Sequence, residues 1–160
     1  TLVFEAEKES PNTMKRAPRR LGSPLFSKSV VWQSLIEGMV LVAIMVLAHW
    51  YMLENGWGED HARAITFLLV TLTNVMLILA ISGKRAVADA FARGVTPLTV
   101  VVTVVSLVLV LVYTIEPVRT LFKFSAISIE EALAAFGLAL VAVSLLFPLR
   151  KLLGMRATKV

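Results

Sequence analysis

The chain lacks the residue types on which most soluble enzymes depend. It has no cysteine and only 2 histidines among its 160 residues, which excludes disulfides and thiolate metal sites. It contains no glycine-rich phosphate-binding motif and no acidic pair placed for acid–base or two-metal chemistry. Charged residues make up only 17% of the chain. These absences predict that the chain has no catalytic activity by itself.

Long apolar runs are what the chain has in abundance. Hydrophobic residues make up 58% of the sequence, and they gather in four stretches at about 30–53, 62–82, 95–115 and 129–147. A helix rises about 1.5 Å per residue, so about 20 apolar residues cross a hydrocarbon core roughly 30 Å thick. An isolated strand in lipid would leave its backbone unpaired. The sequence therefore predicts an all-α membrane protein with four antiparallel transmembrane helices.

Basic residues lie unevenly around these four stretches. Most of the 16 lysines and arginines fall before the first stretch, between the second and third, or after the fourth, whereas the other two connections hold only Arg63, Arg119 and Lys123. Positive charge is enriched on the cytoplasmic side of membrane proteins, which predicts that both termini are cytoplasmic. The net charge of +5 then reflects topology and contact with anionic lipid headgroups, and nucleic acid is not expected as a partner.

The sequence divides into three regions. Residues 1–29 read as the end of a preceding helix and a basic cytoplasmic loop, residues 30–149 as the four-helix transmembrane domain, and residues 150–160 as a basic cytoplasmic tail. Thr96 and Pro97 are expected to begin the third helix, and Ser128 with Glu131 forms a capping box for the fourth. We expect Gly83 to end the second helix and Pro148 to end the fourth.

Strongly polar side chains at membrane depth are costly, and three positions carry them: Glu37, His49 and Asn74. Glu37 is either an ion or proton ligand facing the bundle interior, or a structural partner of a neighbouring helix or a basic loop. The structural interpretation is preferred. His49 lies beside Trp50 and Tyr51 near a membrane boundary and is interpreted as an interfacial anchor.

Asn74 is the strongest single candidate for an ion-binding residue. It lies near the middle of the second stretch and follows Thr71 and Thr73. Threonine hydroxyls can bond to their own helix backbone, whereas an asparagine amide needs a partner across a helix interface or a bound ion. Asn74, Thr73 and Glu37 are therefore the candidate ion ligands. Hydrogen bonding between helices is an equally open role for Asn74.

Three motifs, in the same order along the chain, resemble one family. Met14-Lys15-Arg16-Ala17-Pro18-Arg19, followed by Pro24-Leu25-Phe26, resembles the M-K-R-P-P-R and P-L-F stretch that leads into the seventh transmembrane helix of P-type cation-transporting ATPases. Glu116-Pro117, with Leu121-Phe122 and Ser128, resembles the outer loop between the last two helices of that family. Leu149-Arg150-Lys151-Leu152-Leu153 resembles its closing L-R-K-L-L.

The resemblance implies that the four stretches are the last four helices of such a pump. They would brace the ion-binding helices, and Asn74 would occupy the place of the single ion ligand in the eighth helix of calcium pumps. An asparagine amide there implies a single-ion or differently selective site. Lys15, Arg16 and Arg19 would form a cytoplasmic loop that couples to the cytoplasmic domains of the same pump.

The same resemblance places the chemistry outside this chain. ATP and Mg²⁺ would be bound by the preceding part of the parent translocase, and this chain would need no cofactor. The expected partners are the lipid bilayer, the upstream transmembrane helices and cytoplasmic domains of the pump, and the transported cation. The expected location is the cell (plasma) membrane.

Two other interpretations are open. One is a small standalone transporter or channel, in which a homo-oligomer forms around polar faces that contain Glu37 and Asn74. The other is a structural membrane scaffold without ion contact. Because the chain begins with Thr1 and a short apolar run rather than with methionine, we expect a fragment of a longer protein.

Overall fold

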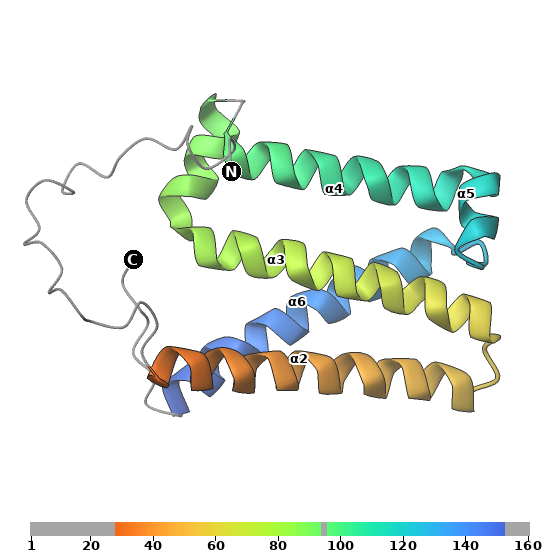
Figure 1. The fold of residues 1–160 in the computed structure, drawn as a ribbon, viewed down its shortest axis with the longest axis horizontal. Coiled ribbons are helices and arrows are strands. Elements are labelled where there is room, and N and C mark those ends of the chain that lie inside the picture. The colour runs from red at the N-terminus through yellow and green to blue at the C-terminus, as the bar shows by residue number, and fades with distance from the viewer. Residues whose placement is uncertain (1–27, 94–95, 153–160) are drawn as a thin grey trace, which may run out of the picture.

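Helices make up almost all of the described part of the chain. The structure, a computed structural model, describes residues 28–93 and 96–152. Its helices, labelled as in Figure 1, are α2 Lys28–Glu54, α3 Glu59–Arg93, α4 Pro97–Thr114, α5 Glu116–Leu121 and α6 Ile129–Leu152. Within those two ranges no residue lies in a strand. The predicted all-α class is confirmed.

Four of the helices are long and apolar enough to cross a membrane. The membrane-crossing segments are Val31–Glu54, Glu59–Ser82, Pro97–Thr114 and Ile129–Arg150. The shortest has 18 residues, which gives about 27 Å of helix, close to the thickness of the hydrocarbon core. The side of the membrane on which each terminus lies stays a prediction. The basic loop with Lys15, Arg16 and Arg19 lies outside the described residues.

Two helix starts follow the chemistry expected from the sequence. Thr96 is the N-cap of α4, with its hydroxyl accepting the Thr99 N–H at 3.2 Å, and Pro97 follows in the first turn, where a missing N–H costs nothing. At α6 the Ser128 hydroxyl accepts the Glu131 N–H at 3.2 Å, and a Glu131 carboxylate oxygen accepts the Ser128 N–H at 2.7 Å. This reciprocal pair is the predicted capping box.

Two expected helix ends are wrong. α3 continues through Gly83 to Arg93, and α6 continues through Pro148 to Leu152. Glycine favours a helix end only where the chain turns into a left-handed conformation, and here it stays helical. Proline removes one backbone donor, a gap that membrane helices tolerate. Continuing α6 past Pro148 places Arg150 on the last helical turn, where it pairs with α2.

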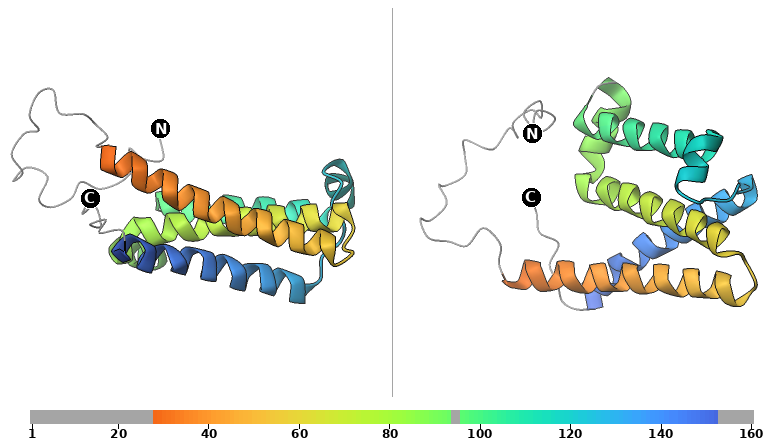
Figure 2. Two further views of the ribbon diagram at one scale, coloured as in Figure 1. Left: turned by 90° about the horizontal axis from the view of Figure 1, so that it is seen from below. Right: turned by 45° about the vertical axis from the view of Figure 1, so that its right-hand side comes forward.

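α3 is the central helix of the bundle. It packs most extensively against α6 and also contacts α2 and α4, while α2 touches α6 as well. Figures 1 and 2 show α6 crossing one side of the α2–α3 pair, with α4 beside α3. We call the end with the α2–α3 turn, α5 and the start of α6 the turn end. The opposite end, with the start of α2 and the end of α6, is the terminal end.

Small side chains bring α3 and α6 together. Ala62 of α3 and Ala139 of α6 are fully buried, and Ala135 and Ala142 of α6 are nearly so. Ala62 and Ala135 share one buried cluster. In membranes helices associate through close packing of small residues rather than through water exclusion. Large apolar side chains instead cover the outside, such as Met39 and Leu107 at 64% and 65% exposed. This inverted arrangement suits a bundle surrounded by lipid and by other helices.

Candidate functional site

Thr73 and Asn74 are adjacent in α3 but lie in different surroundings. Thr73 is 1% exposed, and its hydroxyl donates to the Leu69 carbonyl at 2.7 Å. Asn74 is exposed, and its amide NH₂ donates to the Val70 carbonyl at 3.0 Å. Among the hydrogen bonds of the described residues, none uses the Asn74 side-chain oxygen. Thr73 is therefore part of the helix packing, while Asn74 offers an acceptor on the outer surface of the bundle.

Glu37 forms an ion pair at the terminal end. Arg150 donates from Nε to Glu37 Oε1 and from Nη2 to Oε2, both at 2.7 Å. Gln33 adds a third bond to Oε1 at 2.8 Å. The Glu37 side chain is 14% exposed and the Arg150 side chain is 25% exposed. Two parallel charge-assisted bonds fix both distance and orientation, so this pair joins α2 to α6 with defined geometry.

A second polar network joins α3 to α6 at the turn end. His61 Nε2 lies 2.9 Å from Glu131 Oε1, and His61 Nδ1 bonds to the Ser125 hydroxyl. A carboxylate can only accept, so Nε2 carries the proton in this bond. Trp57 packs edge-on against the imidazole, with ring centroids 5.2 Å apart. The network links α3, the α5–α6 connection and the first turn of α6.

Two further hydrogen bonds tie neighbouring helices to α3. His49 Nδ1 lies 2.8 Å from the Thr66 hydroxyl, which itself donates to the Ala62 carbonyl at 2.7 Å. Because that hydroxyl proton is already used, His49 Nδ1 is the donor. Tyr113 of α4 donates to the Ala64 carbonyl at 2.6 Å. His49 therefore bonds between helices, a role beyond the interfacial anchor expected from the sequence.

Aromatic rings fill the space beside Tyr113. Phe124, which is 8% exposed, lies between α3 and α4 with its ring centroid 5.9 Å from Tyr113 and 5.3 Å from Phe67. Phe122 adds a stacked contact at 5.6 Å. These contacts fold the α5–α6 connection back onto the bundle, so the turn end is closed by packed side chains as well as by hydrogen bonds.

The three predicted ion-ligand candidates do not form one site in the described part of the chain. Glu37 bonds to Gln33 and Arg150, Thr73 to Leu69, and Asn74 to Val70. Among the described residues there is also no group of three or more His, Asp or Glu side chains that could hold a metal ion. A cation bound next to Asn74 would therefore need further ligands from outside this bundle.

A comparison with protein families identifies the family to which this helix bundle belongs. A family model described as "Cation transporting ATPase, C-terminus" matches residues 1–153. The chain belongs to this family. Neither a comparison with curated proteins nor one with solved structures gave a match. The cation-ATPase family and the four membrane-crossing helices together identify an integral, multi-pass membrane domain from the C-terminal part of such an ATPase. The resemblance found in the three motifs is thereby confirmed.

Membership of the cation-ATPase family also identifies the surroundings of the domain. Its partners are the lipid bilayer and the other parts of the ATPase. A standalone transporter or channel is not favoured. The large exposed apolar side chains on α2 and α4 therefore face either lipid or other helices of the same ATPase.

Several side chains that organise the domain were not among the sequence candidates. The sequence places Arg150 in a basic tail after the fourth helix, and its local pattern assigns no role to His61, Ser125 or Tyr113. The sequence does carry a signal for the Glu37–Arg150 pair. Because both termini are predicted on the same side, the start of the first helix and the end of the fourth lie at the same membrane face, and a carboxylate at membrane depth needs a cationic partner. No comparable signal existed for His61 and Ser125, because their contact depends on how the α5–α6 connection folds.

Proposed function

We propose that this domain braces the ion-carrying helices of the cation ATPase by keeping its own four helices in a fixed arrangement. The observation that carries the proposal is the attachment of α6 at both ends: to α2 through the Glu37–Arg150 ion pair and to α3 through the His61–Glu131 bond. A helix held at two points cannot slide or tilt without breaking one of them. Such a domain provides a rigid surface for the ion-carrying helices, which move relative to it.

The brace also depends on where the polar bonds lie. The Glu37 and Arg150 side chains are only 14% and 25% exposed, so this ion pair has little water with which to exchange. Removing one member of a desolvated ion pair leaves an uncompensated charge, at a cost of about 3–5 kcal/mol when the pair is fully buried. The helices are therefore held more tightly than apolar packing alone would hold them.

Asn74 is proposed as the one ligand that this domain offers to the transported cation. Asparagine side-chain carbonyls are among the oxygen ligands that hard cations accept. The Asn74 amide nitrogen bonds to its own helix, which orients the amide and leaves its oxygen as the acceptor. Being neutral, it adds less negative charge than a carboxylate, which favours a single-ion or differently selective site.

The remaining assignments concern parts of the ATPase that the described residues do not include. Lys15, Arg16 and Arg19 are proposed to transmit movements of the cytoplasmic domains, which would bind ATP and Mg²⁺. The plasma membrane is the proposed location. Replacing Arg16 and Arg19 by alanine in the intact ATPase should uncouple ATP hydrolysis from transport, and unchanged coupling would contradict this role.

The bracing role is tested by breaking and reversing the ion pair in the intact ATPase. With Arg150→Gln we expect the number of cations transported per ATP to fall about threefold or more, because α6 loses its attachment at the terminal end. The exchange Glu37→Arg with Arg150→Glu should recover part of the loss. Arg119→Gln is the matched control, since Arg119 makes no ion pair among the described residues. Unchanged coupling in Arg150→Gln would refute the brace.

The ligand role of Asn74 needs a separate measurement. Asn74→Ala should raise the cation concentration for half-maximal ATPase activity about tenfold, equivalent to roughly 1.4 kcal/mol. Asn55→Ala, in the α2–α3 turn, is the control, because Asn55 bonds only within its own turn, to the Tyr51 carbonyl at 2.8 Å. An unchanged cation dependence in Asn74→Ala would refute the ligand role of Asn74 and would leave the brace unaffected.

A further inference from the structure

The short helix α5 leaves the direction of α4 as soon as α4 ends. Figures 1 and 2 show α5 turned across the end of α4. Ile115, between the two helices, is extended, with φ −85° and ψ 111°. Pro117 has no N–H for the Tyr113 carbonyl, four residues before it, which disfavours a continued α4. The chain therefore changes direction directly after an 18-residue span.

Helix α4 ends deeper in the bundle than the point where α3 begins. Ala64 of α3 and Val112 of α4 share a buried cluster, and Tyr113 donates to the Ala64 carbonyl. From this level α3 extends outward to Glu59, about 7.5 Å away, whereas α4 extends only to Thr114, about 3 Å away. The chain therefore turns into α5 about one helical turn below the start of α3.

Helix α5 has one apolar side against the bundle and another that faces outward. Val118 packs against the buried cluster between α3 and α4. Leu121 is 80% exposed. Along α4 the exposed side chains of Leu107, Leu111 and Ile115, four residues apart, form a stripe that ends beside α5. The outward side of α5 therefore continues the membrane-facing surface of α4.

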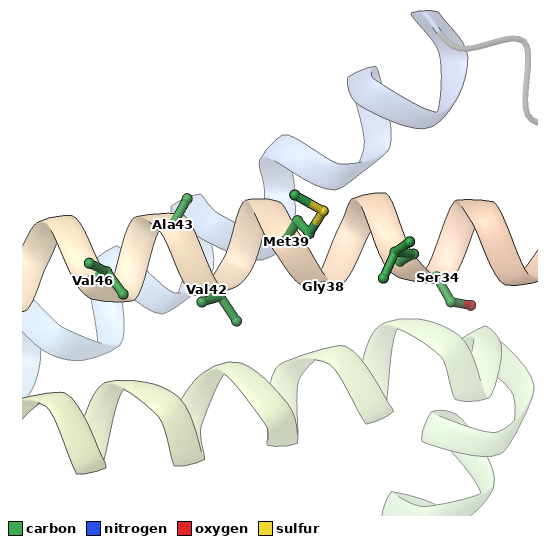
Figure 3. Close-up of a pocket in the computed structure, with 7 residues that line it drawn as sticks. Ser34, Gly38, Met39, Val42, Ala43 and Val46 are labelled. Atoms are coloured by element: carbon green, nitrogen blue, oxygen red, sulfur yellow. The ribbon is translucent and has the colours of Figure 1, made fainter.

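The outward side of α5 differs in depth and charge from the apolar hollow on α2. Residues between Ser34 and Val46 of α2 line that hollow, within a membrane-crossing segment (Figure 3). At α5, Leu121 is followed two residues later by Lys123, which is exposed and has no ion-pair partner among the described residues. An apolar side chain close to a free ammonium group suits the boundary between acyl chains and phosphate groups.

A phospholipid satisfies both side chains at this level. Its acyl chains can surround Leu121, which would otherwise stay in contact with water at a cost in free energy. Its phosphate supplies the anion that Lys123 lacks, and the Lys123 backbone is held in place because its N–H donates to the Thr120 carbonyl at 3.0 Å. The bilayer is already a partner of this domain, so phospholipid is present at this surface without any further polypeptide.

We propose that α5 is an interfacial helix that binds a phospholipid of the leaflet at the turn end, with Leu121 among the acyl chains and Lys123 at the phosphate. Helix α5 then belongs to the membrane surface and fixes the depth of α4, the shortest of the four membrane-crossing segments. This anchoring is separate from the brace, because it uses neither the Glu37–Arg150 ion pair nor the His61–Glu131 bond.

Photo-crosslinking in the intact ATPase, reconstituted into phospholipid vesicles, tests the occupant of the α5 surface. A benzophenone side chain in place of Leu121 should form phospholipid adducts, which mass spectrometry detects. Glu59 is the matched control position at the same end, with a side chain 85% exposed. The same probe there should give about fivefold fewer lipid adducts, because Glu59 lies further out. A crosslink from position 121 to protein, or equal lipid adducts at both positions, would overturn the proposal.

The choice of headgroup tests the part assigned to Lys123. In vesicles with equal amounts of phosphatidylcholine and phosphatidylglycerol, adducts of the probe at position 121 should favour the anionic lipid about threefold. Lys123→Gln should bring this ratio close to one, whereas Lys123→Arg, which keeps the charge, should preserve it. An even ratio with Lys123 present, or an unchanged preference in Lys123→Gln, would overturn the proposal.

Discussion

Helix α6 is attached to the bundle at both ends, and the two attachments are built differently. At the terminal end two parallel bonds join Arg150 to Glu37, both 2.7 Å long. At the turn end Glu131 bonds to His61 and to the Ser128 backbone, and aromatic side chains pack close by. One attachment is concentrated in a single ion pair, while the other is distributed over several weaker contacts. A single substitution should therefore do most damage at the terminal end.

The largest effect is expected from Arg150→Gln. Loss of the guanidinium leaves the Glu37 carboxylate, 14% exposed, with Gln33 as its one hydrogen-bond partner among the described residues. We expect the free energy of unfolding of the chain to fall by about 3 kcal/mol, the low end for a broken buried pair. It can be measured by titrating detergent-solubilised protein with a denaturing surfactant and following tryptophan fluorescence. Adding Glu37→Gln should restore part of the loss, and no recovery would contradict the ion-pair explanation.

His61→Ala should have the next largest effect. It removes the bonds to Ser125 and Glu131 and the edge contact with Trp57. Because water reaches the turn end and Glu131 keeps its bond to Ser128, we expect a loss of about 2 kcal/mol by the same measurement. A loss larger than that of Arg150→Gln would reverse the comparison between the two ends. His49→Ala breaks a single interhelical hydrogen bond, to Thr66. Its loss in free energy of unfolding shows how much one such bond contributes.

The sequence predicts the fold better than it predicts these attachments, for a physical reason. Apolar length and helix capping are local properties, so the four spans and the Thr96 and Ser128 caps could be inferred directly. The continuation of α6 through Pro148 could not, because it depends on packing and on the Arg150 pair rather than on local preference. Contacts such as His61 with Ser125 join residues 64 positions apart, and local pattern carries no information about them.

A smaller effect is expected from Tyr113→Phe. Only the hydroxyl is lost, and with it the 2.6 Å bond to the Ala64 carbonyl, while the stacked contact with Phe124 is kept. Loss of one neutral hydrogen bond should lower the free energy of unfolding by about 1 kcal/mol. Tyr51→Phe is the control, since the Tyr51 side chain is 64% exposed and its hydroxyl makes no bond among the described residues. Equal losses in both variants would remove Tyr113 from the contacts that hold the turn end.

Ser128→Ala should have the smallest effect on the free energy of unfolding. It nevertheless gives the most direct test of the difference between the two attachments of α6. It removes the cap on the Glu131 N–H, which should lower the free energy of unfolding by about 0.5 kcal/mol at a wet helix end. Glu131 uses one oxygen for His61 and the other for the Ser128 backbone, so Ser128→Ala and His61→Ala should not be additive. Arg150→Gln lies at the far end of the 24-residue helix, about 30 Å away, and should add independently to either of them. Additivity between Ser128→Ala and His61→Ala would show that the turn end is not one connected network, and the contrast between a concentrated and a distributed attachment would then be lost.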